Sequence, residues 1–147
     1  KNSGVAVALE NLTTPPTNDP HLFHHLVSQS GAHVTIDIGH AHAVQALKPQ
    51  GDIFGDYVLP HRHRILNAHI YHTELDGYGH VPPETLSDIS ARLDLLGVAE
   101  TCDWWVIELM NPSEMLHTRN LLQTYLDALS LQPLAVPDKN QLPLVAA

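Results

Sequence analysis

Residues 35–42 read TIDIGHAH, and this short stretch carries the main clue to the fold. It continues a run of β-branched residues, which favours a buried strand. Asp37 nevertheless interrupts the apolar run, and His40 and His42 follow just beyond a glycine. A carboxylate and imidazoles at the end of a buried strand need a partner, and a divalent cation is a common one. The stretch therefore predicts a strand that ends at a metal site.

Three other apolar segments also carry an acidic residue or a histidine near their end. GVAVALENL at 4–12 reaches Glu10, RILNAHIY at 64–71 contains His69, and WWVIEL at 104–109 contains Glu108. Each segment is short, apolar and bounded by polar or turn-forming residues, as expected of a buried strand. Each thus places one side chain suited to metal binding near the end of a predicted strand.

Helical patterns separate these strands. Asp19 and Pro20 predict the start of a helix that Gly31 ends. Two short helices are expected at 40–47 and 52–59, and ETLSDISARLDLLG at 84–97 predicts one amphipathic helix. Residues 72–84 are interpreted as a loop, and a long helix is expected at 113–129. The chain therefore alternates strand and helix four times, which predicts an α/β fold with a parallel sheet.

Composition narrows the possible functions. The 147 residues suit one domain, and 16 acidic against 7 basic residues give a net charge of −9. We therefore expect no nucleic-acid partner. We expect no membrane span and no signal peptide, and the single cysteine fits a reducing, cytoplasmic location. The chain has 12 histidines, of which five are interpreted as solvated surface residues: His21, His24, His25, His61 and His63.

The four strand-end side chains are predicted to converge. In parallel βα architectures the carboxyl ends of all strands lie at one rim, and that rim carries the chemistry. Converging carboxylates repel one another unless a cation lies between them. The predicted ligands of a divalent metal ion are Glu10, Asp37, His69 and Glu108. The motifs GxGxxG, GxxxxGK[ST] and GxSxG are absent, so nucleotide-phosphate binding and serine-hydrolase chemistry have no motif support.

The motifs ALEN, DIGH, NAHIYH and VIEL resemble those of the xylose isomerase-like TIM-barrel superfamily. That superfamily includes sugar-phosphate isomerases and epimerases and the endonuclease IV branch. The matching motifs are those of strands five to eight. The resemblance implies that residues 1–130 form four βα units, the C-terminal half of a TIM barrel, followed by a proline-rich C-terminal arm at 131–147. We expect the missing N-terminal half to come from a longer product, or from another chain in a homo-oligomer.

The resemblance also implies roles for individual residues. One Mn²⁺, Mg²⁺, Co²⁺ or Zn²⁺ ion would be bound by Glu10, Asp37, His69 and Glu108. The implied catalytic residues are Glu10, Glu108 and His40. Additional metal or substrate contacts are expected from His40, His72 and His80. Asn11 and Tyr71 are candidates for supporting or substrate contacts, and His42 for a supporting position behind the ligands.

Three hypotheses about the function remain open, and the first two are enzymes that act on a small-molecule substrate. Sugar or sugar-phosphate isomerisation is favoured, with Glu10 and Glu108 transferring a proton while the metal stabilises an enediolate. The second is a metal-dependent phosphodiesterase of the endonuclease IV-like branch, because CDWWVIEL at 102–109 resembles the cobamide-remodelling enzymes. That branch expects an Asp-x-His pair where this chain has Tyr78-Gly79-His80. Ketose epimerases usually have an arginine where this chain has leucine at position 75, so a free-ketose epimerase is not well matched either. The third is a noncatalytic metal-binding half-barrel.

Overall fold

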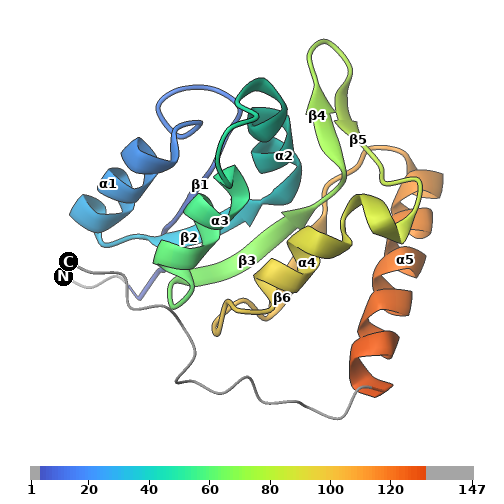
Figure 1. The fold of residues 1–147 in the computed structure, drawn as a ribbon. Coiled ribbons are helices and arrows are strands. Elements are labelled where there is room, and N and C mark those ends of the chain that lie inside the picture. The colour runs from blue at the N-terminus through green and yellow to red at the C-terminus, as the bar shows by residue number, and fades with distance from the viewer. Residues whose placement is uncertain (1–3, 132–147) are drawn as a thin grey trace.

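A four-stranded parallel sheet organises the structure, a computed structural model that describes residues 4–131. Its strands are β1 (Ala8–Glu10), β2 (His33–Asp37), β3 (Ile65–Ile70) and β6 (Trp104–Ile107), hydrogen-bonded in the order β1-β2-β3-β6 (Figure 1). The predicted α/β fold with a parallel sheet is confirmed. Across the described residues the sheet is open, with β1 and β6 as its edges, and forms no closed barrel.

At least one helix follows each strand of the sheet in the chain. The helices are α1 (Pro20–Ser30), α2 (Ile38–Leu47), α3 (Ile53–Val58), α4 (Ser90–Leu96) and α5 (Pro112–Leu131), with short 3₁₀ turns η1 (Leu59–His61) and η2 (Leu86–Asp88). The Asp19 carboxylate accepts hydrogen bonds from the first turn of α1, and Gly31 ends that helix with φ of 68°. None of the helices within residues 4–131 is both long and apolar enough to cross a bilayer. The arm expected at 131–147 lies, apart from Leu131 at the end of α5, outside the described residues.

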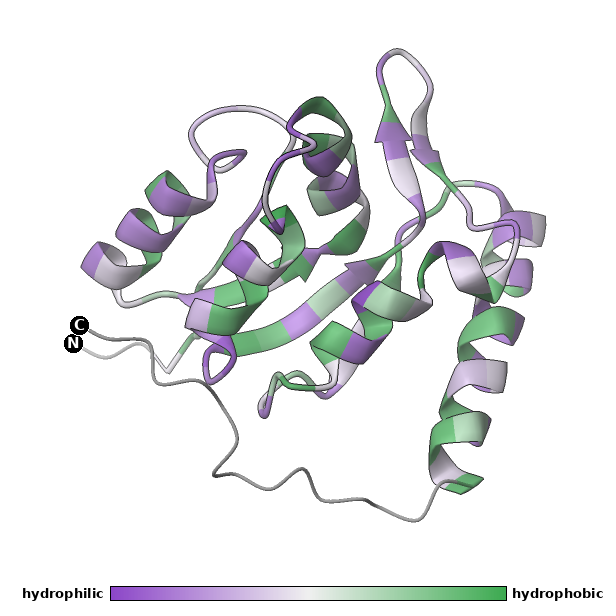
Figure 2. Ribbon diagram, in the orientation of Figure 1, coloured by the Kyte–Doolittle hydropathy of each residue, from purple (hydrophilic) through white to green (hydrophobic). Residues whose placement is uncertain are grey.

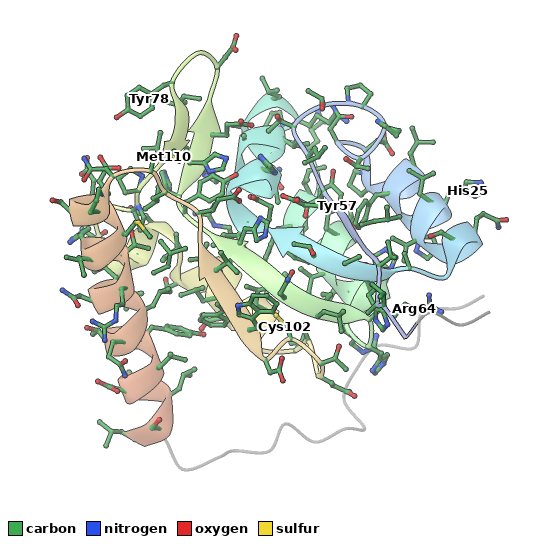
Figure 3. The ribbon with its side chains drawn as sticks, turned by 180° about the vertical axis from the view of Figure 1, so that it is seen from behind. His25, Tyr57, Arg64, Tyr78, Cys102 and Met110 are labelled. Carbon is green, nitrogen blue, oxygen red and sulfur yellow. The ribbon has the colours of Figure 1, made fainter. Side chains whose placement is uncertain are left out.

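The hydrophobic core lies between the helices and one face of the sheet. Figures 1 and 3 show α1, α3 and α4 on the same side of the strands, and Figure 2 shows the apolar residues of strands and helices. Val34 and Ile36 of β2 are fully buried there. On the opposite face Thr35, Asn67 and Trp104 are register partners, and Trp104 is 62% exposed. No helix among the described residues covers that face.

The single helix expected at 84–97 is divided into η2 and α4. The Asp88 carboxylate accepts hydrogen bonds from the backbone N–H groups of Glu84 and Thr85, which closes a separate capping turn. Ile89 then leaves the helical region, with φ of −128° and ψ of −16°. The predicted apolar face consists of Leu86, Ile89, Leu93 and Leu96. The exposed fractions of Ile89, Leu93 and Leu96 are 1%, 0% and 2%, and Leu86 is half-buried against the core.

The loop expected at 72–84 contains a β-hairpin. Strands β4 (Thr73–Leu75) and β5 (Gly79–Val81) pair antiparallel, and the tip between them is Asp76-Gly77-Tyr78. Gly77 and Gly79 have φ of 72° and 93°, a backbone conformation that glycine adopts without strain. Figure 1 shows this hairpin beside α2, beyond the end of β3.

His61 is buried, in contrast to the solvated position expected from the sequence. Its exposed fraction is 3%, and its ring makes an edge contact with Phe23 at a centroid distance of 5.6 Å. Burial, with the nearby charges of His24 and Arg64, lowers the pKa of His61 from 6.5 to about 4.

This burial predicts a pH dependence of folding stability. Between pH 6.5 and about 4, unfolded His61 binds a proton that the native protein excludes. The stabilisation that comes from neutral His61 is therefore complete above pH 6.5. It is lost as the pH falls from 6.5 to about 4, by at most about 3 kcal/mol. His61→Gln should flatten the slope of urea unfolding free energy against pH. The exposed control His25→Gln should keep it, and an unchanged slope in His61→Gln would contradict a buried, neutral His61.

Candidate metal centre

Four side chains meet where the parallel strands end. Glu10 and Asp37 are the last residues of β1 and β2, His69 is next to last in β3, and Glu108 directly follows β6. Each offers one ligand atom, and these atoms lie within 4.8 Å of one another. His69 Nδ1 is 2.7 Å from Glu108 Oε2, 3.2 Å from Glu10 Oε1 and 3.6 Å from Asp37 Oδ2. The side chains thus converge as the strand-end argument predicts, and metal binding by them stays a prediction.

The polar atoms of this cluster fit a cation. Asp37 Oδ2, His69 Nδ1 and Glu108 Oε2 are buried and make no hydrogen bond, although His69 Nδ1 lies 2.7 Å from Glu108 Oε2. A buried polar group without a partner costs about 1–3 kcal/mol. A divalent ion among three carboxylates and one imidazole would satisfy all of these atoms, and this donor set suits Mn²⁺, Mg²⁺, Co²⁺ or Zn²⁺.

Electrostatics show how strongly the carboxylates need positive charge. Short polar contacts with Asp37 and Glu10, together with the negative charges of Glu10 and Glu108, outweigh burial and raise the pKa of His69 to about 10. Burial acts to raise the pKa of Glu10, but contact with His69 and nearby imidazole charge hold it below its ordinary value. Without a metal, His69 would therefore carry the proton that balances the carboxylates, and a bound metal would displace that proton.

Asn11 fixes the end of β2 relative to β1. Its side chain is fully buried, donates from Nδ2 to the Asp37 carbonyl at 2.9 Å, and accepts the Asp37 N–H at 2.8 Å. Asp37 Oδ1 in turn accepts the backbone N–H of His40 at 2.7 Å, which caps α2. The position of the Asp37 carboxylate is therefore set by hydrogen bonds from both sides.

A second group of candidate ligands lies beside the first. It consists of His40, Glu74 and His80, whose ligand atoms also lie within 4.8 Å of one another. Glu74 and His80 are direct cross-strand partners in the hairpin, and His40 Nε2 lies 3.5 Å from Glu74 Oε2. Sequence reasoning had singled out His40 and His80 but had missed Glu74.

Backbone carbonyls orient both imidazoles of this second group. His40 Nδ1 lies 3.0 Å from the Asn11 carbonyl, and His80 Nδ1 lies 2.7 Å from the Glu108 carbonyl. Because a carbonyl only accepts hydrogen bonds, each ring donates from Nδ1 and leaves Nε2 free for a ligand. This is the usual arrangement behind metal-binding histidines.

His40 also lies next to the first cluster. Its Nδ1 is 3.3 Å from Asp37 Oδ2 and 3.7 Å from Glu10 Oε1. Tyr71 packs between the helix and the hairpin, with its ring stacked on His80 at a centroid distance of 4.0 Å. A Cβ atom at Gly39 would lie 2.1 Å from the Tyr71 ring, so this close approach requires the glycine of the DIGH motif.

His72, predicted as a further contact, lies outside both groups. Its ring is 4.7 Å from that of His42 between centroids, and its Nδ1 lies 3.2 Å from an Arg92 nitrogen. Arg92 is buried and also donates to the carbonyls of Ile38 and His72. These contacts give His42 and His72 places in the packing behind the clusters.

Comparison with known proteins gives one similarity. A protein of Methanocaldococcus jannaschii described as uncharacterized protein MJ0008 is 29% identical over 127 residues, covering 86% of this chain and 53% of that protein. The chain thus spans about half the length of the curated relative it matches. No family model matches the chain, and no solved structure matches it significantly. The fold and the two groups of side chains therefore describe an α/β chain with four potential metal ligands at the ends of its parallel strands and three more on α2 and the hairpin.

Proposed function

We propose that this chain forms part of a divalent-metal-dependent enzyme that hydrolyses a phosphate ester of a small molecule. The observation that carries the proposal is the second ligand group, His40, Glu74 and His80, beside the first. Enzymes that cleave phosphate esters commonly hold two or more metal ions close together. From the motif alone, the missing Asp-x-His pair weighed against this function. Glu74 supplies a carboxylate near His40 and His80 from another position.

The exposure of the first four ligands suggests a division of roles. The Asp37 side chain is 0% exposed and that of His69 is 19% exposed, so both are suited to holding an ion in place. The side chains of Glu10 and Glu108 are 30% and 43% exposed and can reach a substrate. A divalent ion bound there would act as a Lewis acid toward a phosphoryl oxygen. Glu108 or Glu10 would accept the proton of the attacking water.

Isomerisation or epimerisation of a sugar is the second candidate. It is favoured by the oxygen-rich first cluster, which has three carboxylates and one imidazole. Such a donor set suits Mn²⁺ or Mg²⁺ better than a set of only nitrogen and sulfur ligands would. Here too the accessible residues are Glu10 and Glu108, which would remove a proton from one carbon of the substrate and return it to the next.

We also propose that the open sheet is the C-terminal half of a TIM barrel. Two observations support this: both edge strands, β1 and β6, have an unpaired side in the described residues, and the chain matches about half the length of its relative. Four further βα units pairing with these edges would close the barrel and surround the two clusters with additional side chains.

Metal stoichiometry tests the proposed function. Isothermal titration of the metal-free chain with Zn²⁺ should show at least about two tight sites, as expected of a multinuclear centre. His80→Gln should remove one of them and leave the other. His117→Gln is the matched control, because His117 lies on α5 outside both groups. A single Mn²⁺ site unaffected by His80→Gln would favour the isomerase. If the complete protein binds zinc but acts on neither phosphodiesters nor sugars, a noncatalytic binding module is indicated.

A further inference from the structure

A buried arginine lies behind the second ligand group. Arg92 of α4 is only 9% exposed, yet within residues 4–131 it forms no ion pair with a carboxylate. Because arginine keeps its charge in proteins, a guanidinium in such a place is costly unless hydrogen bonds surround it. The backbone groups that it binds therefore explain why it is buried there.

The Arg92 guanidinium joins three parts of the backbone. Its Nη1 donates hydrogen bonds to the carbonyl oxygens of Ile38 at 3.0 Å and His72 at 2.8 Å. Its Nη2 donates to the Asp88 carbonyl and lies 3.2 Å from His72 Nδ1. Ile38 is the first residue of α2, and His72 connects β3 to the hairpin. A single nitrogen, Nη1, thus holds the start of α2 against the base of the hairpin.

The carbonyls that Nη1 binds lie close in sequence to the candidate ligands. His40 follows Ile38 by two residues, and Glu74 follows His72 by two residues. The His72 N–H also donates at 2.9 Å to the carbonyl of Val81, the residue that follows the third ligand. Because such short segments have little freedom, fixing these backbone groups also fixes where the three ligands lie.

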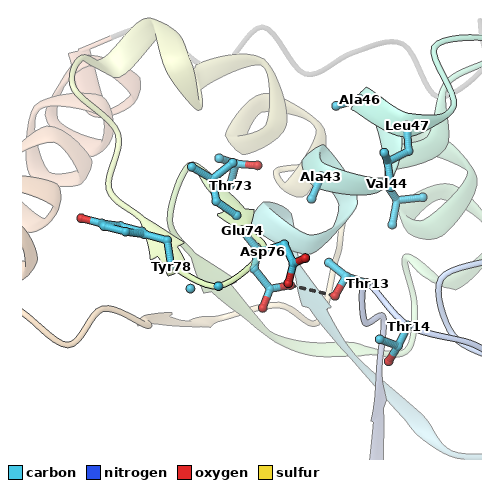
Figure 4. Close-up of a pocket in the computed structure, with 13 residues that line it drawn as sticks. Thr13, Thr14, Ala43, Val44, Ala46, Leu47, Thr73, Glu74, Asp76 and Tyr78 are labelled. Atoms are coloured by element: carbon cyan, nitrogen blue, oxygen red, sulfur yellow. Dashed lines mark hydrogen bonds between the residues drawn. The ribbon is translucent and has the colours of Figure 1, made fainter.

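Side-chain packing leaves the separation of α2 and the hairpin partly open. A cleft of about 830 Å³ is lined by α2 and the hairpin, and Figure 4 shows Leu47 of α2 on one side and Tyr78 of the hairpin tip on the other. The hydrogen bond that Glu74 accepts from Thr13 ties the hairpin to the loop after β1 and not to α2. The separation therefore depends on the base of the hairpin, where Tyr71 packs and the guanidinium binds both backbones.

We propose that Arg92 is a positioning residue of the second ligand group. It holds the start of α2 and the base of the hairpin at the separation that lets the three ligands share one ion. Arginine suits this task because its planar guanidinium offers five N–H donors in fixed directions, whereas lysine has three donors on one nitrogen. The inference rests on the proposed function, because it assigns a further residue to the same metal centre.

Hydrogen exchange of the chain in excess chelator tests the positioning without metal. In Arg92→Gln the shorter side chain cannot bind all of the carbonyls, so the base of the hairpin should open more often. The His72 amide, which donates to Val81, should exchange at least about tenfold faster, as expected from losing hydrogen bonds to a charged group. The Val34 amide, which donates to the Arg64 carbonyl within the sheet, should keep its exchange rate.

Zinc titration tests the effect on the ligands. Arg92→Gln should weaken the second site at least about tenfold and keep the first, so its titration should resemble that of His80→Gln. The double variant Arg92→Gln/His80→Gln should lose no more than His80→Gln alone, because both substitutions disable the same group. Arg92→Lys keeps the charge but not the planar fork, so it should weaken the second site less than Arg92→Gln does.

Two controls separate positioning from general stability. Leu93→Ala removes a fully buried side chain from the same helix and lowers stability, yet it should keep both zinc sites. Arg119→Gln removes an exposed guanidinium from α5 and should change neither hydrogen exchange nor zinc binding. If Arg92→Gln does not fold, Arg92→Lys provides both measurements.

The outcomes distinguish this inference from the proposed function. The positioning role is overturned by unchanged exchange of the His72 amide, by normal affinity at both zinc sites in the Arg92 variants, or by an equal loss of the second site in Leu93→Ala. Each of these results retains the metal centre. Absence of zinc binding in the unsubstituted chain would instead reject the metal centre, and exchange of the His72 amide would then still show whether Arg92 holds the hairpin.

Discussion

Glu108→Gln should abolish turnover by the complete form of the proposed enzyme while changing the free energy of unfolding little. The Glu108 side chain is 43% exposed and lies 2.7 Å from His69 Nδ1, at the rim of the sheet and outside the hydrophobic core. Glutamine keeps the size of the side chain but removes the charge that binds metal or accepts a proton. The loss in turnover should be at least about 100-fold, as expected for an acid–base group.

Steady-state kinetics and urea unfolding check this expectation together. Glu84→Gln is the matched control, because Glu84 is exposed and uses only backbone groups in its hydrogen bonds. The backbone carbonyl of Glu108, which holds His80, is unchanged in the glutamine variant. Full turnover by Glu108→Gln would remove Glu108 from the catalytic residues.

Leu93→Ala should destabilise the chain by about 2–5 kcal/mol, the usual cost of a cavity left by a buried leucine. Leu93 is fully buried in the core between α4 and the sheet. The midpoint of urea unfolding should therefore fall sharply with an unchanged m-value.

Leu116→Ala provides the comparison for this core position. Leu116 lies on α5 with 58% of its surface exposed, and alanine favours helix at least as well as leucine. Its substitution should change the unfolding free energy by less than about 1 kcal/mol. Equal effects of the two substitutions would show that α4 does not pack on the sheet as described.

The parts of the fold that follow local rules were predictable from the sequence. Asp19 and Gly31 mark the ends of α1 because a side-chain cap and a left-handed residue each satisfy backbone groups at a helix terminus. The four strands were recognisable from short apolar runs. Their parallel arrangement then placed Glu10, Asp37, His69 and Glu108 at one rim by topology alone.

The second ligand group depends on features with weak local signals. Strands β4 and β5 have three residues each, too few for a clear alternation of polar and apolar residues. The Asp76-Gly77 pair at the tip was an available hairpin signal. Without the hairpin, Glu74 had no predicted neighbour. The burial of His61 was missed for a similar reason, because its contact with Phe23 of α1 is fixed only by tertiary packing.

Pairing of Glu74 directly opposite His80 makes the second group sensitive to the length of the hairpin tip. Side chains alternate between the two faces of a strand, so slippage by one residue would turn Glu74 away from His40 and His80. Inserting or deleting one residue within Asp76-Gly77-Tyr78 would thus dismantle this group while leaving all seven candidate ligands in the sequence. The length of the hairpin tip is therefore as much a requirement of the proposed metal centre as its candidate ligands.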